Sequence, residues 1–141
     1  MENKYFTPDI EDLCIRYELE VNYNFKLNDI FHKKIIENFE ELADIHSRMS
    51  GDCVIRVPYL TKEQIEAEGW KEEQMYLNGT FVMILGELNE GYELMFAEGN
   101  SQIVITRVWT LFDDQVKRDN TYKGNCKDIN TFRKIIKLLN I

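Results

Sequence analysis

Cysteine and proline are scarce in this chain of 141 residues, which contains three cysteines and two prolines. Cys14, Cys53 and Cys126 are odd in number and widely spaced, so they fit neither a disulfide framework nor a Cys-x-x-Cys metal site. We interpret them as free thiols. With so little proline and a hydrophobic content of 44%, the composition is typical of an ordered globular protein. The length favours a single domain over residues 1–141.

Long hydrophobic runs are also missing. No apolar stretch approaches the roughly 20 residues that a membrane-spanning helix needs. The first residues, MENKYFTPDIED, carry acidic side chains where a secretory signal peptide would be apolar. We therefore expect a cytoplasmic protein that makes no membrane contact.

The sequence contains none of the common catalytic or phosphate-binding motifs. Its seven glycines form neither GxGxxG nor GxxxxGK[ST], and there is no HExxH or nucleophile elbow. The two histidines, His32 and His46, are far apart, so a Cys–His pair would have to be assembled by the fold. We expect no catalytic residues, no cofactor and no bound metal ion. A small enzyme that depends on cysteine or carboxylate groups remains an alternative.

Positive charge is sparse in the first part of the chain. The net charge is −8, and residues 1–100 carry 21 acidic and nine basic side chains, against four and eight in residues 101–141. Because an acidic surface repels a phosphate backbone, direct nucleic-acid binding is not expected unless the basic C-terminal helix acts alone.

The first part of the chain shows strand and helix patterns in turn. Apolar residues alternate with polar ones from Leu13 to Phe25, which predicts a long strand with one buried face. Residues 30–36 fit a returning strand or the start of a long helix, and we favour the strand. Asn38 followed by two acidic residues predicts a helix over 39–49.

The segment Ile55 to Trp70 combines a strand with a capped helix. The strand ends at Pro58, which has no N–H to donate. Thr61 and Gln64 form a capping box that predicts a short helix over residues 62–68, and Gly69 provides the stop.

The second half predicts an antiparallel meander and a closing helix. Strands are expected at 75–85, 92–96 and 103–109, followed by a polar loop over 110–121 and a short strand at 122–126. Asp128 is the expected N-cap of a helix through Leu139. The fold class is therefore α+β: an antiparallel sheet of five to seven strands with two or three short helices, the C-terminal helix packed on the sheet. The predicted core is Ile15, Tyr17, Leu19, Val21, Ile55, Val57, Ile84, Ile103, Ile105, Phe132, Ile135 and Ile136, and Trp109 is placed in the core as well.

Acidic and aromatic residues around the short helix form the candidate interaction surface, which consists of Glu63, Glu66, Trp70, Glu72 and Glu73. Tryptophan is enriched at binding hot spots, and dense carboxylates can imitate a nucleic-acid backbone. Against this, Lys62 and Lys71 interrupt the acidic run, and a solvated helix face would show the same composition. Asp113 and Asp114 form a second acidic pair in the late loop.

Three segments carry a resemblance to a known group: FTPDIEDL (6–13), IRVPYLTKEQIEAEGW (55–70) and CKDINTFRKIIKLLNI (126–141). They resemble a recurring pattern in small uncharacterised proteins encoded by phages and prophages of gut bacteria. The resemblance implies a mobile-element product acting in a bacterial host, and it assigns no catalytic or binding residue. We therefore expect a phage-derived accessory protein that acts non-enzymatically by binding another protein. The alternatives are an acidic inhibitor of a host defence nuclease and the small enzyme named above.

Overall fold

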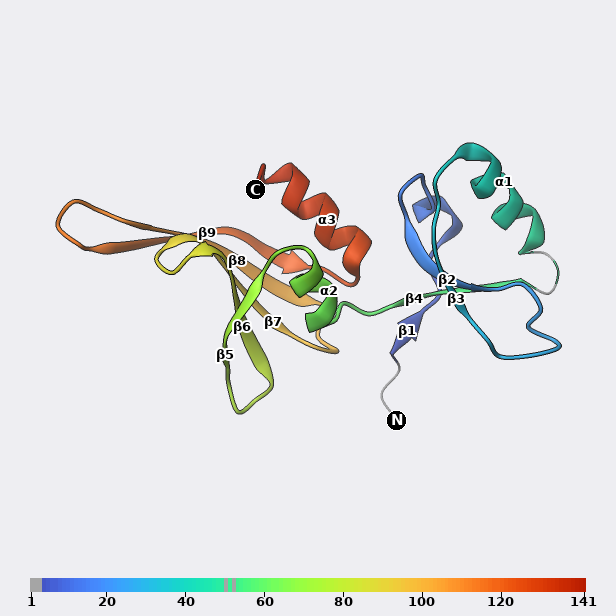
Figure 1. The fold of residues 1–141 in the computed structure, drawn as a ribbon, viewed down its shortest axis with the longest axis horizontal. Coiled ribbons are helices and arrows are strands. Elements are labelled where there is room, and N and C mark those ends of the chain that lie inside the picture. The colour runs from blue at the N-terminus through green and yellow to red at the C-terminus, as the bar shows by residue number, and fades with distance from the viewer. Residues whose placement is uncertain (1–3, 50, 52) are drawn as a thin grey trace. The chain divides into compact units, whose positions relative to one another are not determined.

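A computed structural model describes residues 4–49, 51 and 53–141 of the chain (Figure 1). The fold is α+β, as the sequence predicts. It contains two antiparallel sheets, of four and five strands, where one sheet of five to seven strands was expected. The chain divides into two compact units, Met1–Tyr59 and Leu60–Ile141, where the length favoured one domain. Each unit has its own hydrophobic core.

The first unit is a four-stranded antiparallel sheet with one α-helix. In the order β1-β4-β2-β3, its strands bury Leu19, Val21, Ile55 and Val57, and Ile45 of the helix joins that core. The elements are β1 (Tyr5–Phe6), a 3₁₀ turn η1 (Ile10–Asp12), β2 (Glu18–Asn22), β3 (His32–Ile35), α1 (Phe39–Arg48) and β4 (Val54–Pro58).

The long strand expected from Leu13 to Phe25 is wrong in extent, because β2 covers only five residues. Before it, Arg16 has a left-handed φ of 76°, which breaks an extended chain. After it, the buried Asn22 side chain accepts a hydrogen bond from Asn24 N at 2.9 Å and donates one to Asn28 O at 2.9 Å. Both ends of the alternating run are therefore turns.

The predicted hairpin strand and the first helix are confirmed. The strand β3 pairs antiparallel with β2, so residues 30–36 do not begin a long helix. The side chain of Asn38 accepts a hydrogen bond from Glu41 N at 2.9 Å, which caps α1 where the sequence places the cap.

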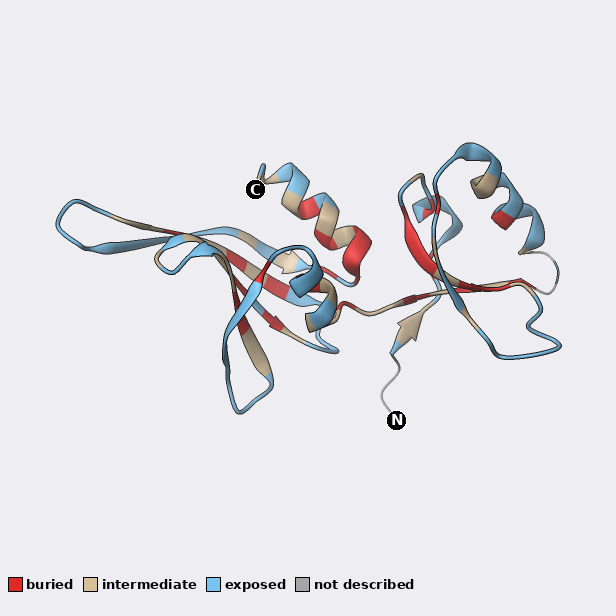
Figure 2. Cartoon of the chain, in the orientation of Figure 1, coloured by how far each residue is buried: buried red, intermediate tan, exposed pale blue. Residues whose placement is uncertain are grey.

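The second unit is a five-stranded antiparallel meander with two helices, in the strand order β5-β6-β7-β8-β9. Its core combines Ile65 of α2 and Phe132 of α3 with Met83, Leu94 and Ile105 of the sheet. The C-terminal helix thus packs on the sheet, as predicted (Figure 2). The elements are α2 (Lys62–Ala67), β5 (Lys71–Met75), β6 (Thr80–Glu87), β7 (Glu90–Ala97), β8 (Gln102–Thr110), β9 (Val116–Asn125) and α3 (Ile129–Leu138).

The single strand expected over residues 75–85 is wrong, because a turn divides this region between β5 and β6. Tyr76 N donates to Thr80 O at 2.8 Å, and Asn78 Oδ1 accepts from Thr80 N at 3.1 Å. Gly79 adopts the left-handed φ of 86° that such a turn requires. The sequence pattern does not predict β5, because every residue of this edge strand is exposed. The strand therefore shows no alternation of apolar and polar residues.

The polar loop expected over residues 110–121 is also wrong, because β9 already begins at Val116. The strand is the outer edge of the sheet and pairs only with β8, from Val116 opposite Thr110 to Asn125 opposite Gln102. An edge strand needs no apolar face, so this mostly exposed strand lacks the apolar pattern that would distinguish it from a loop.

Most of the predicted core is confirmed. Ile15, Ile84 and Ile136 are half-buried, and the other nine residues are buried. Trp109 is half-buried and does not belong to either core cluster. The reason is its position: beyond Val108, β8 pairs with β9 alone, so the sheet is too narrow there to cover an indole ring.

Candidate functional site

The predicted acidic surface begins at the helix α2, and its capping box is present. Thr61 N donates to Gln64 Oε1 at 3.1 Å, and Gln64 N donates to Thr61 Oγ1 at 3.3 Å. The helix ends at Ala67, and Gly69, which follows the C-cap residue Glu68, has the left-handed φ of 98° that stops the helix. The local structure that positions these acidic residues is therefore the one the sequence predicts.

The carboxylates around α2 are partly neutralised by a lysine. The Nζ atom of Lys62 lies 2.5 Å from Glu72 Oε2 and 3.7 Å from Glu66 Oε1. The hydrogen bond to Glu72, followed by the charges of the neighbouring carboxylates, raises the pKa of Lys62. Glu63 and Glu66 are exposed on the helix. A lysine at the centre of the group means that these acidic residues form no unbroken negative stripe.

Glu73 lies in a different environment from Glu72. The β5–β6 register shifts between Glu72 and Gln74, so Glu73 is the bulged residue. Arg118 forms an ion pair with Glu93, and the hydrogen bond of this pair raises the pKa of Arg118, to which the charges of Glu93 and then Glu73 add. Glu73 therefore interacts electrostatically with Arg118 of β9, whereas Glu72 forms an ion pair with Lys62 of α2.

Trp70 is a core residue, although the sequence places it on the interaction surface. Its side chain is only 2% exposed and packs edge-to-face on Phe132, with ring centroids 6.1 Å apart. An indole buried in this way makes no contact on the outer face. The five predicted surface residues thus occupy three environments and do not form one surface.

The residues considered for an enzyme lie in different surroundings: two of the cysteines are buried, and the two aspartates lie in a turn. Cys53 and Cys126 are buried, and burial raises the pKa of both thiols, that of Cys126 to about 12. A thiol with so high a pKa is a poor nucleophile near neutral pH. Asp113 and Asp114 form the turn between β8 and β9, where Asp113 Oδ1 accepts from Gln115 N at 3.3 Å and Asp114 has a φ of 62°.

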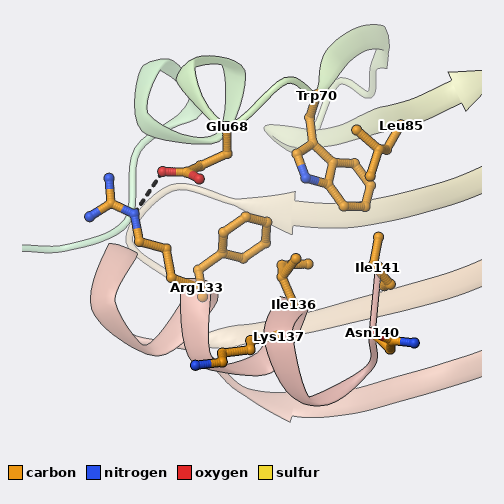
Figure 3. A pocket seen from close by; sticks show the side chains of 9 residues that line it. Glu68, Trp70, Leu85, Arg133, Ile136, Lys137, Asn140 and Ile141 are labelled. Carbon is orange, nitrogen blue, oxygen red and sulfur yellow. Dashed lines mark hydrogen bonds and ion pairs between the residues drawn. The ribbon is translucent and has the colours of Figure 1, made fainter. Parts of the chain in front are cut away.

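A hollow of about 410 Å³ lies in the second unit, between α3 and the chain that joins α2 to β6. Its lining is as polar as it is apolar, and the apolar part has Trp70 and Leu85 on one side and Ile136 and Ile141 on the other (Figure 3). At one end Arg133 Nε donates to Glu68 Oε1 at 2.7 Å. Lys137 and Asn140 complete the lining from the side of α3.

The second site is a group of exposed apolar side chains at one end of the five-stranded sheet, which we call the hairpin end. It combines the β6–β7 turn with the β8–β9 turn. Thr110 joins the two turns by donating hydrogen bonds from Oγ1 to Asn89 O (3.1 Å) and from N to Glu90 Oε1 (3.3 Å). Phe112 is fully exposed, and the other members are at least 39% exposed. The hairpin end consists of Leu88, Leu111, Phe112 and Val116.

Sequence reasoning missed the hairpin end, although one feature could have revealed it. Leu111 and Phe112 directly precede the turn residues Asp113 and Asp114. An apolar pair beside a turn has no core to enter, because loops run over the surface.

Among the described residues, no group of three or more His, Cys, Asp or Glu side chains is arranged to hold a metal ion. Within the same part of the chain, no helix is both long enough and apolar enough to cross a membrane. Comparison with protein-family models, curated protein sequences and solved structures finds no match.

Proposed function

We propose that this chain is a phage-derived accessory protein that acts by binding another protein of a bacterial host through the hairpin end. The observation that carries the proposal is the exposure of Leu88, Leu111, Phe112 and Val116 on two turns that are held together. Exposed apolar groups gathered in this way are typical of protein-binding surfaces. The phage origin is supported by the resemblance carried by residues 6–13, 55–70 and 126–141.

The acidic alternative has less support from the geometry. Inhibition of a nuclease by mimicry needs carboxylates in a continuous array, and Lys62 interrupts the array by pairing with Glu72 and Glu66. A thiol enzyme has less support as well, because burial raises the pKa of Cys126.

Substitution of one turn residue tests the proposal. We expect Phe112→Ser to weaken binding to a captured and purified host partner by tenfold or more, since removing a large apolar anchor costs about 2 kcal/mol at a binding hot spot. Leu77→Ser is the matched control. Leu77 is equally exposed but lies on the β5–β6 turn.

The measurement is a titration of the labelled partner against each variant, with circular dichroism to confirm the fold. Equal affinity of the wild type and Phe112→Ser would exclude the hairpin end as the binding surface.

A further inference from the structure

We propose that the hairpin end recognises a cationic partner, namely a segment of another protein that presents apolar side chains together with lysine or arginine. The inference rests on the proposed function, because it specifies the chemistry of the partner for that same surface. Its basis is the charge of the two turns that carry the exposed apolar groups. Residues 86–91 and 110–116 contain no basic residue and four acidic ones, which are Glu87, Glu90, Asp113 and Asp114.

The four carboxylates have no cation that neutralises them. All four residues are exposed, and none forms an ion pair within the part of the chain that the structure describes. The nearest basic residue along the chain, Lys117, follows Val116 in β9, so the two side chains point to opposite faces of the strand. This end of the sheet therefore differs from the surface around α2, where Lys62 pairs with two carboxylates.

The acidic residues repel one another in the free protein. Glu87 lies directly opposite Glu90 in the β6–β7 register, and like charges at opposed positions destabilise an antiparallel pair. Asp113 and Asp114 are adjacent in the β8–β9 turn. A cationic group bound beside these residues offsets the repulsion, whereas an acidic partner adds to it. The charges therefore select a partner that carries positive charge.

The apolar residues of the hairpin end define the second feature of the partner. Phe112 is fully exposed, and Leu88, Leu111 and Val116 are at least 39% exposed. The β8–β9 hairpin reaches beyond the β6–β7 turn, so its tip is open to an approaching molecule (Figure 1). Burial of these side chains favours binding by about 25 cal/mol per Å² of apolar surface, which a purely polar segment would not provide.

Three synthetic peptides serve as probes of this preference. The first combines leucine and lysine in an amphipathic helix, the second has glutamate in place of lysine, and the third has serine in place of leucine. We expect saturable binding of the labelled leucine–lysine peptide, measured by fluorescence anisotropy, and much weaker binding of the other two. Phe112→Ser should weaken the binding of the leucine–lysine peptide about tenfold, because it removes the most exposed apolar group.

Substitution of the two aspartates isolates the contribution of charge. Asp113→Asn combined with Asp114→Asn removes two charges and preserves the turn. An amide oxygen can still accept from Gln115 N, and asparagine tolerates the left-handed φ of 62° at position 114. We expect about fivefold weaker binding of the leucine–lysine peptide, the equivalent of about 1 kcal/mol. The matched control is Glu11→Gln combined with Asp12→Asn, an adjacent exposed pair in the first unit, which should leave the affinity nearly unchanged.

The inference is overturned by an absence of saturable binding of the leucine–lysine peptide, by equal binding of the leucine–glutamate peptide, or by equal effects of the two double substitutions. A captured host partner that loses affinity with Phe112→Ser, but not with the Asp113→Asn and Asp114→Asn pair, would exclude the cationic preference and leave the proposed function intact. Self-association of the wild type that Phe112→Ser abolishes would assign the hairpin end to a second copy of this chain and overturn both proposals.

Discussion

Arg56 of β4 contacts two aromatic rings and a carboxylate in the first unit. Its guanidinium lies 3.6 Å from the centroid of the Tyr5 ring and 3.7 Å from that of Phe31. It also donates to Glu20 Oε1 from Nε at 2.9 Å, and Nη2 lies 2.7 Å from the same oxygen. A planar cation between two rings joins β1 and the β2–β3 loop to the centre of the sheet.

Arg56→Lys should therefore destabilise the protein although the charge is kept. A lysine ammonium cannot stack on two rings or reproduce the planar hydrogen-bonding geometry, and we expect a loss of about 1–2 kcal/mol. Urea denaturation followed by far-ultraviolet circular dichroism measures the change. Arg16→Lys is the control, because Arg16 is exposed, and such surface substitutions usually change the stability by less than about 0.5 kcal/mol. Equal losses would show that stacking around Arg56 adds nothing.

Cys126 makes stability depend on pH. Burial raises the pKa of its thiol from 9.0 to about 12, so above pH 9 the unfolded chain releases a proton that the folded chain retains. The stabilisation is complete below pH 9 and is lost as the pH rises toward 12, by about 1.4 kcal/mol per unit. The stability advantage of the wild type over Cys126→Ala should therefore shrink by about 1 kcal/mol between about pH 8 and pH 10.

The corresponding control is Cys14→Ala, since Cys14 is exposed. Chemical denaturation at the two pH values supplies the comparison. A constant difference between the wild type and Cys126→Ala would mean that the buried thiol ionises as it does in the unfolded chain.

At the scale of elements, helix α3 depends on a buried cap. Asp128 is 3% exposed, and its carboxylate accepts from Thr131 Oγ1 at 2.6 Å, from Thr131 N at 3.4 Å and from Asn130 Nδ2 at 2.7 Å. We expect Asp128→Ala to lower the free energy of unfolding by about 2 kcal/mol, since it removes both the cap and the buried hydrogen bonds. Thermal denaturation measures the loss.

The cap of α1 provides the comparison for α3. Asn38 is exposed and bonds only Glu41 N among the contacts that the structure gives its side chain. Asn38→Ala should cost about 1 kcal/mol. If the two substitutions cost the same, burial of the Asp128 cluster would contribute nothing beyond ordinary capping.

The helices of this chain could be predicted from the sequence, because capping is a local interaction. Asn38, Thr61 with Gln64, and Asp128 each bond a backbone group within three residues. The strand errors arose where the outcome depends on distant partners. The edge strands β5 and β9 consist largely of polar residues and owe their conformation to β6 and β8, so no local pattern marks them.

The candidate site was harder to predict than the fold. The sequence does not distinguish the surroundings of Trp70 and Trp109. Trp70 is buried because it packs on Phe132, whereas Trp109 is half-buried because only β9 pairs with β8 at its position. The pairing of Lys62 with Glu72 brings together residues of a helix and a strand, so their mutual neutralisation cannot be read from composition.

At the scale of the whole molecule, the boundary between the two units falls between adjacent residues. Tyr59 N donates to Lys4 O at 3.0 Å, and the Tyr59 ring packs on Phe6 in the first unit. Leu60 N donates to Lys127 O at 3.0 Å, and the Leu60 side chain is buried in the second core. Each residue thus belongs to the unit on its own side of the boundary.

A fragment of residues 60–141 should therefore fold without the rest. It contains all five strands of its sheet, both helices and a complete core, so we expect a cooperative urea transition and the blue-shifted emission of a buried Trp70. The full chain is the reference. A fragment without a cooperative transition would mean that residues 1–141 are a single folding domain, as the length of the sequence favours.

Both outer strands of the five-stranded sheet combine a register shift with charged side chains. The irregularity in β5 lies at Glu73, and that in β9 lies at Thr121, opposite the step from Ile105 to Thr106. A straight strand offered by a neighbouring molecule would meet misaligned donors and acceptors at either border, together with charges that resist dehydration. We therefore expect that strands of neighbouring molecules do not add to this sheet and that the protein forms no fibrils at high expression levels.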